Sequence, residues 1–102
     1  MRHKFNAKPV AIDGKKFPSK MEGRYYQQLM TRKEAGEVLF FLRQIPFDLP
    51  GGITYRADFM TFLADGTCEV IDVKGMDTPV SKLKRKQVEE LYPLVIKVVE
   101  KC

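Results

Sequence analysis

The sequence predicts an α/β domain in which a mixed four-stranded sheet is flanked by two helices, after a short basic N-terminal arm or hairpin. Three observations support this fold class. Residues 19–35 and 79–92 have helical periodicity and begin with helix-start signals. Residues 37–74 contain three apolar stretches separated by glycine-containing turns, and a fourth apolar stretch follows the second helix. The expected order is therefore helix, strand, strand, strand, helix, strand.

The length and composition indicate one folded domain with a basic surface. The 102 residues, of which 44% are hydrophobic, suffice for one core but not for two. We divide the chain into a basic arm, residues 1–17, and a domain, residues 18–102. The net charge of +5 favours polyanionic partners, which include nucleic acids and anionic membrane surfaces. Because no membrane-spanning run or secretory signal is present, we expect a cytoplasmic protein with no membrane partner.

The N-terminal segment is rich in lysine and in turn residues. Asp13-Gly14 separates two short stretches, which indicates either a hairpin or an extended arm. The segment carries Lys4, Lys8, Lys15 and Lys16. These lysines either lie along a phosphate backbone or are part of the solvated surface.

The few histidines and cysteines restrict the possible chemistry. His3 is the single histidine, and the two cysteines, Cys68 and Cys102, match no zinc spacing and fit reduced thiols. Sites built on histidine are therefore disfavoured, whereas a site in which carboxylates hold a hard metal ion remains open.

The first helix should begin at Ser19 and end near Ala35, before Gly36. Ser19 and Glu22 have the spacing of a capping box. Glu22 also falls within the apolar arc of the helix, which contains Met21, Tyr25, Tyr26, Leu29 and Met30. Glu22 therefore has two possible roles: it either closes the capping box or faces the sheet as a carboxylate that binds a metal ion or its water.

Three strands and their turns should follow the first helix. Residues 37–47 are the most apolar stretch, although Arg43 and Gln44 interrupt it, and either of these side chains could reach a phosphate. A loop over residues 48–52 should precede the next two strands, 53–63 and 68–74, which Asp65-Gly66 joins as a hairpin.

The third strand carries two charged residues that share a face. Side chains alternate along a strand, so Asp72 and Lys74 point one way and Ile71 and Val73 point the other. Hairpin pairing can bring Asp58 beside Asp72. Buried charges are costly unless they are paired or liganded, and two carboxylates with a lysine suit Mg²⁺ or Mn²⁺ and a phosphoryl group. The alternative is an ordinary ion pair at the end of a strand.

The second helix should run from Pro79 to Tyr92, where Pro93 stops it. Its apolar arc contains Val80, Leu83, Val88, Leu91 and Tyr92. Lys84 and Gln87 fall in the same arc, where they either snorkel at the edge of the core or point toward the sheet end that bears Asp72 and Lys74. Lys82, Arg85 and Lys86 should lie on the outer side. Residues 94–99 form a final strand, parallel to its neighbour because a helix precedes it.

This ordered set of residues resembles the PD-(D/E)xK nuclease superfamily, which has a restriction-endonuclease-like αβββαβ core. The resemblance extends from Ser19 to Val99, and Asp72-Val73-Lys74 corresponds to the (D/E)xK element. Ala57 departs from the motif, which often has proline before the acid at position 58. The segments closest to small phage and prophage endonucleases are SKMEGRYYQQL, YRADF, EVIDVKG and KLKRKQVEELYP.

The resemblance implies a Mg²⁺- or Mn²⁺-dependent endodeoxyribonuclease. Asp58, Asp72 and the Val73 carbonyl would bind the metal, Glu22 would bind it directly or through water, and Lys74 would position the nucleophile or stabilise phosphoryl charge. A phage-encoded relative would act in the bacterial cytoplasm, as a homodimer, on branched DNA such as Holliday junctions. The DNA-contacting residues would be Lys15, Lys16, Lys82, Lys84, Arg85, Lys86 and Gln87.

Two other functions remain open from the sequence. The first is a non-catalytic DNA-binding accessory protein that retains the nuclease fold. The second is a basic RNA- or protein-binding module in which the carboxylates are incidental, although the chain lacks the aromatic pattern of common RNA-binding sheets.

Overall fold

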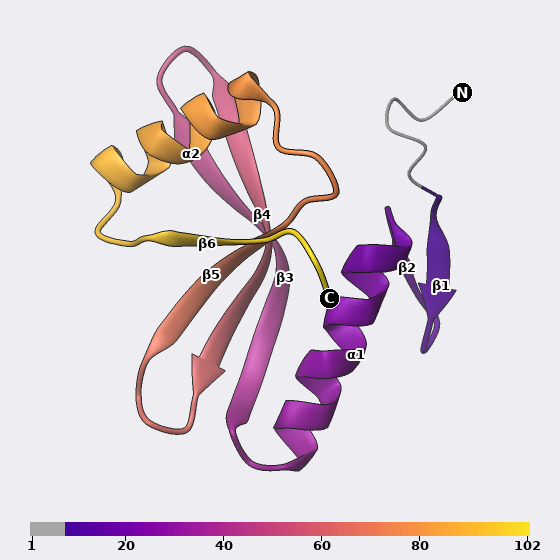
Figure 1. Ribbon diagram of the computed structural model, residues 1–102. Helices are drawn as coiled ribbons and strands as arrows, with labels where there is room; N and C mark the ends of the chain where they lie inside the picture. Colours follow the sequence, from indigo (N-terminus) through magenta and orange to yellow (C-terminus); the bar gives the residue numbers. More distant parts are fainter. Residues whose placement is uncertain (1–7) are drawn as a thin grey trace.

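The computed structural model describes residues 8–102 and has the expected α/β architecture (Figure 1). The order of elements from the first helix to the last strand is confirmed. Residues 1–7, which include His3 and Lys4, lie outside the described residues. The elements are β1 (Val10–Ile12), β2 (Lys15–Phe17), α1 (Lys20–Glu34), β3 (Val38–Leu49), β4 (Ile53–Leu63), β5 (Cys68–Val73), α2 (Pro79–Leu91) and β6 (Ile96–Val99).

The four-stranded sheet has the order β3-β4-β5-β6. The first three strands are antiparallel, and β6 pairs in parallel with β5 after the crossover through α2, as predicted. The expected loop over residues 48–52 is shorter than predicted, because β3 continues to Leu49, which pairs with Ile53. Phe47 and Leu49 are buried, and this burial favours continuation of the strand.

The two helices pack against opposite faces of β5. Val70 belongs to the cluster around Val88 of α2, whereas Ile71 belongs to the cluster formed with α1. In β4, Ala57 joins the α2 cluster and Phe59 the α1 cluster, although residues two apart share a face in a regular strand. The strand therefore twists about Asp58, and Figure 1 shows the strands crossing near the centre of the molecule.

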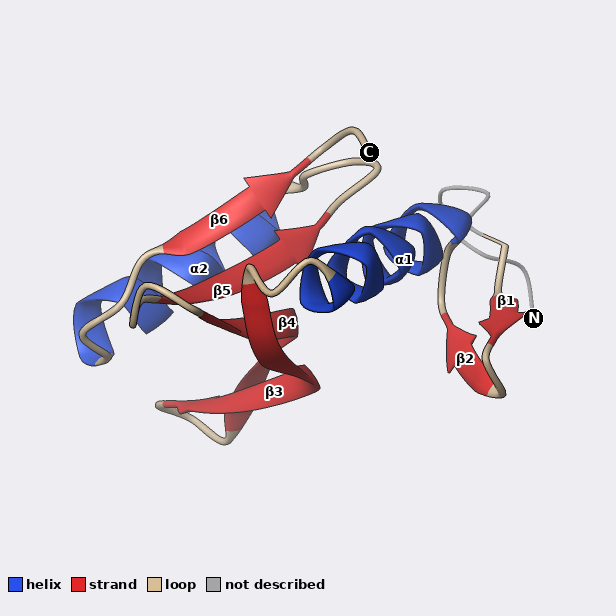
Figure 2. Cartoon of the chain, turned by 90° about the horizontal axis from the view of Figure 1, so that it is seen from below, coloured by secondary structure: helices blue, strands red, loops and turns tan. Residues whose placement is uncertain are grey.

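The N-terminal segment forms a hairpin that packs on α1. β1 and β2 pair antiparallel, and Phe17 is buried in the main core. Gly23 permits the close approach, since a Cβ atom there would lie 2.8 Å from Ile12 Cδ1. Figure 2 shows this hairpin beyond the N-terminal end of α1, at the opposite end of the molecule from α2.

The rotation of α2 about its axis differs from the prediction. Val88 is its one buried residue, whereas Val80, Leu83 and Leu91 are exposed. Arg85, predicted on the outer side, turns inward and binds Asp77. The prediction assumed that the apolar residues would set the inward face. The ion pair and the packing of Val88 set that face instead. The prediction is therefore wrong for Val80, Leu83, Leu91 and Arg85, and it is confirmed for Val88, which is buried, and for Lys82 and Lys86, which are exposed.

The C-terminal residue contacts the beginning of α1. The Cys102 thiol donates to the Met21 carbonyl oxygen at 3.2 Å, and Arg24 Nε donates to the Cys102 oxygen at 3.0 Å. Cys68 and Cys102 are both free thiols, as expected. None of the helices within residues 8–102 is long and apolar enough to cross a membrane.

Candidate active site

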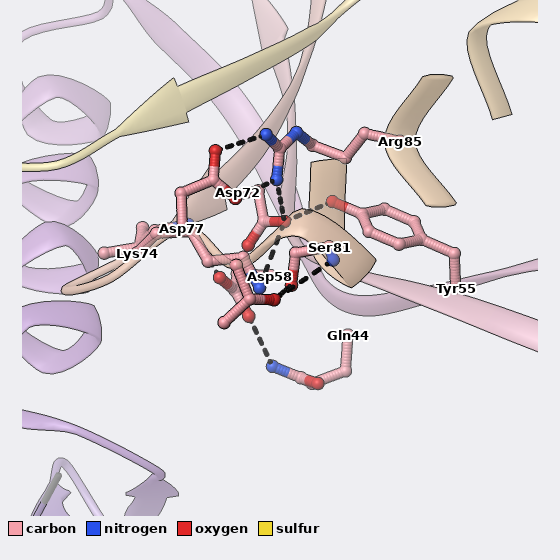
Figure 3. Close-up of polar contacts among 10 residues, drawn as sticks. Gln44, Tyr55, Asp58, Asp72, Lys74, Asp77, Ser81 and Arg85 are labelled. Carbon is pink, nitrogen blue, oxygen red and sulfur yellow. Dashed lines mark hydrogen bonds and ion pairs between the residues drawn. The ribbon is translucent and has the colours of Figure 1, made fainter. Parts of the chain in front are cut away.

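Three carboxylates and a lysine meet where the first turn of α1, the middle of β4 and the end of β5 converge. Figure 3 shows Asp58, Asp72 and Lys74 of this group. Glu22 and Asp72 are each 2% exposed, and Asp58 is half-buried. Asp58 Oδ2 accepts a hydrogen bond from the Val73 N–H at 2.7 Å. This bond joins β4 to β5 beyond Phe59 and Ile71, where the backbone pairing of the two strands ends. Lys74 Nζ lies 3.6 Å from Asp72 Oδ2. The structure thus brings together the four residues that the sequence singled out.

Gln44 connects two of these acids. Its Nε2 donates to Glu22 Oε2 at 3.1 Å and lies 3.4 Å from Asp58 Oδ1. Gln44 has a positive φ of 54°, which is uncommon for a residue with a side chain and is often retained at functional sites. The Glu22 carboxylate therefore faces the sheet, while the Ser19 side chain alone caps the helix by accepting from the Glu22 N–H at 3.1 Å.

Besides Lys74, donors from two further residues hold the Asp72 carboxylate. The buried Tyr55 hydroxyl donates a short hydrogen bond to Asp72 Oδ2, and Arg85 Nη1 lies 4.0 Å from the same oxygen. Arg85 also makes two hydrogen bonds to the Asp77 carboxylate, at 2.8 and 2.5 Å. The sequence reasoning missed Tyr55, although Tyr55 belongs to the same YRADF segment as Asp58.

The crowding of carboxylates changes their acidity. Burial, together with the nearby Glu22 carboxylate, raises the pKa of Asp58 to about 8. Burial also raises the pKa of Glu22, although Asp58, Arg43 and Gln44 oppose this change. Burial is the largest cause for both groups, and for Asp58 the repulsion from Glu22 adds to it. A proton or a cation between the acids would relieve this repulsion.

The donor chemistry of the cluster fits a hard divalent cation. Carboxylate oxygens are the ligands that Mg²⁺ and Mn²⁺ prefer, and Glu22, Asp58 and Asp72 supply them from three elements. Within the described residues, however, no three histidine, cysteine or acidic side chains are already arranged as a metal centre. Asp72 Oδ2 is directed to Tyr55, Lys74 and Arg85 instead.

A pocket of about 770 Å³ opens above the acids. The first residues of both helices border it, so the positive ends of two helix dipoles face the same space. Charged residues form one part of its lining and apolar residues another. The lining residues are Pro18, Ser19, Met21, Glu22, Asp58, Val73, Lys74, Gly75, Met76, Thr78, Val80 and Ser81.

The residues predicted to contact DNA are dispersed over two surfaces. Lys15 and Lys16 are exposed on the β1–β2 hairpin, and Lys82 and Lys86 are exposed on α2. Lys84 and Gln87 are half-buried, and neither is the residue of α2 that reaches Asp72. That residue is Arg85, so its predicted outward position is corrected to one beside the acids.

Comparison with known proteins identifies a family without an assigned activity. No curated protein and no solved structure matches the chain. A family model described as a protein of unknown function, DUF1064, matches residues 2–102. Because this match covers nearly the whole sequence, the chain belongs to the DUF1064 family.

Proposed function

We propose that this protein is a divalent-metal-dependent endodeoxyribonuclease that hydrolyses DNA phosphodiester bonds. The proposal is carried by one observation: Glu22, Asp58, Asp72 and Lys74 meet at one site, in the order and on the elements expected of a PD-(D/E)xK nuclease. The net charge of +5 favours a polyanionic substrate.

The side chains divide the work of the reaction. Asp58, Asp72 and the Val73 carbonyl would hold Mg²⁺ or Mn²⁺, with Glu22 as a further ligand. When bound, the cation supplies Lewis-acid stabilisation of charge on the phosphoryl group. Lys74 donates a hydrogen bond to the attacking water or to a phosphoryl oxygen. The products carry 5′-phosphate and 3′-hydroxyl ends.

The surroundings of the acids favour phosphate as well as metal. Both helices direct their N-terminal ends toward the pocket, and Lys74 adds a positive charge to the lining of the pocket. Each chain carries one such site, so cutting both strands of a duplex or a junction would require two copies. We therefore propose that the active species is a homodimer and that branched DNA is its preferred substrate.

The test is cleavage of a labelled four-way junction and of the matching linear duplex, each with Mg²⁺, Mn²⁺ or EDTA. Wild-type protein should cut in either metal and not in EDTA. Lys74→Ala should slow cutting about a hundredfold or more, because a donor to the developing charge is lost. Lys97→Ala removes an exposed lysine that lies 3.9 Å from Glu69 on the sheet, and this matched variant should cut normally.

The acids are tested separately with Asp72→Asn. This change preserves shape but removes a charged ligand, so cleavage should be lost while DNA binding, measured by gel shift, persists. A protein that binds both DNAs and cuts neither in any metal would instead be a non-catalytic accessory protein. Normal cutting by Asp72→Asn would show that the site is assigned wrongly.

A further inference from the structure

The pocket above the acids has apolar walls that metal and phosphate chemistry do not require. Pro18 and Met21 border it from the beginning of α1. Met76, in the loop before α2, and Val80, in the first turn of α2, also border the pocket, and they are 57% and 62% exposed. Large apolar side chains that stay this exposed beside a charged site are candidates for ligand contact.

The backbone that carries Met76 and Val80 is anchored on both sides. The Lys74 N–H donates to the Val99 carbonyl oxygen at 2.9 Å, and Asp77 is held by the two hydrogen bonds from Arg85. Thr78 then caps α2 by accepting from the Ser81 N–H at 3.1 Å. The backbone at Met76 and Val80 is therefore held in place, which reduces the backbone entropy lost when a ligand binds there.

The chemistry of DNA decides what such walls can contact. A paired duplex presents phosphates and sugars on its outside, and its base faces are stacked within the helix. An unpaired nucleotide exposes a flat apolar base face attached to a charged phosphate. The pocket likewise combines an apolar part with a charged part. Glu22, Asp58 and Lys74 form the charged part of its lining.

We propose that the pocket binds an unpaired nucleotide of the DNA substrate. Its base packs against Met76 and Val80, within the apolar part of the lining that also includes Pro18 and Met21, while its phosphate lies at the acids and Lys74. The assignment of the phosphate rests on the proposed nuclease function. The proposal narrows the substrate to DNA that is single-stranded, or distorted at a branch, at the position of cleavage.

The test measures binding without cleavage. Ca²⁺ replaces Mg²⁺, and fluorescence anisotropy follows a labelled single strand and the same strand in a blunt duplex. The double variant Met76→Ser, Val80→Ser should weaken single-strand binding about tenfold, because the base loses its apolar contacts with both side chains, and should leave duplex binding nearly unchanged. Leu91→Ser is the matched control, because Leu91 is 55% exposed at the other end of α2 and should affect neither DNA.

The possible outcomes separate this inference from the nuclease proposal. Selective loss of single-strand binding supports the pocket as a nucleotide site, whether or not the wild type cleaves DNA in Mg²⁺. Unchanged binding, or an equal loss on both DNAs, overturns the inference. If the wild type still cuts DNA in a Lys74-dependent way after that result, the nuclease proposal stands and only the unpaired nucleotide is rejected.

Discussion

Tyr55 places a phenol directly against a carboxylate at the centre of the site. The Tyr55 side chain is 5% exposed, and its hydroxyl donates to Asp72 Oδ2. Burial, followed by the Asp72 carboxylate, raises the pKa of Tyr55, so the hydroxyl keeps its proton and can act as a donor at all relevant pH values. A donor of this kind fixes the orientation of a carboxylate ligand.

Replacing Tyr55 with phenylalanine should weaken metal binding while keeping the fold. Phenylalanine fills nearly the same volume, but Asp72 loses the donor that orients it. Outer contacts of this kind are worth roughly 10- to 100-fold in metal affinity or activity. Calorimetric titration with Mn²⁺, together with the Mg²⁺ concentration needed for half-maximal cleavage, measures the effect.

Tyr92→Phe provides the control for Tyr55→Phe. The Tyr92 hydroxyl donates to the Asp48 carbonyl oxygen at 2.9 Å, away from the acids, so this variant also loses one phenolic hydrogen bond. It should bind Mn²⁺ as the wild type does. If both variants lose the same metal affinity, the effect is one of general stability, and Tyr55 does not orient Asp72.

The contact between the β1–β2 hairpin and α1 depends on a residue that helices normally avoid. Glycine within a helix costs about 1 kcal/mol relative to alanine. At Gly23, however, a Cβ atom would lie 2.8 Å from Ile12 Cδ1 and 3.0 Å from Val10 Cγ2. The hairpin can therefore approach α1 closely, and it brings Phe17 into the core.

Gly23→Ala should destabilise the protein, although alanine is the better helix former. Overpacking costs about 1–3 kcal/mol, and the gain in helix propensity offsets about 1 kcal/mol of this. The expected net loss of about 1 kcal/mol corresponds to a decrease in melting temperature of roughly 4–8 °C. Thermal unfolding followed by circular dichroism measures it.

A second substitution identifies the cause of that loss. Ile12→Val removes the Cδ1 atom that the new methyl group would meet. When Ile12→Val is already present, Gly23→Ala should be nearly neutral, which a double-mutant cycle expresses as a coupling energy. An equal loss in both backgrounds would rule out the contact with Ile12 Cδ1.

The elements differ in how well the sequence predicts them. Ser19 and Gly36 mark the ends of α1 through capping and a positive φ, which are local signals. The rotation of α2 was not predictable from local signals, because it depends on the ion pair between Asp77 and Arg85 and on the packing of Val88. Only the tertiary fold brings these contacts together.

At the scale of the whole molecule, the sequence predicted the acids of the site but not what surrounds them. Strand alternation and hairpin pairing suffice to place Asp58, Asp72 and Lys74 together. The positions of Gln44 and Tyr55 depend on the positive φ at Gln44 and on the twist of β4 at Asp58. Periodicity carries no information about either feature.

The acid cluster should also make the stability of the whole protein depend on pH. Asp58 has a pKa of about 8 in the folded protein, against about 3.9 in an unfolded chain. Between these values the folded state binds the additional proton, so stability is highest below the unfolded pKa and is lost as the pH rises toward 8. The raised pKa of Glu22 acts in the same direction.

Other shifted carboxyl groups act in a different range. The pKa values of Glu37, Asp65 and Asp77 are lowered from ordinary values of 4.5, 3.8 and 3.8 by hydrogen bonds to Arg32, Thr67 and Arg85. Their contributions are lost as the pH falls through those lowered values, so they vary little above about pH 5. The slope between about pH 5 and about pH 8 therefore reports on Asp58 and Glu22.

Urea unfolding in EDTA should show wild-type stability falling from about pH 5 to about pH 8, by at most about 1.4 kcal/mol per pH unit for each additional proton bound. Asp58→Asn removes the titrating group without changing its shape, so it should flatten the slope and exceed wild-type stability at the higher pH. Asp48→Asn changes an exposed carboxyl group on β3, the strand that pairs with the strand of Asp58, and it should keep the pH dependence of the wild type. A wild-type protein that becomes more stable as the pH rises would show that Asp58 is already ionised when folded.

Mg²⁺ should stabilise the wild type at the higher pH and not Asp58→Asn, because the cation takes the place of the proton.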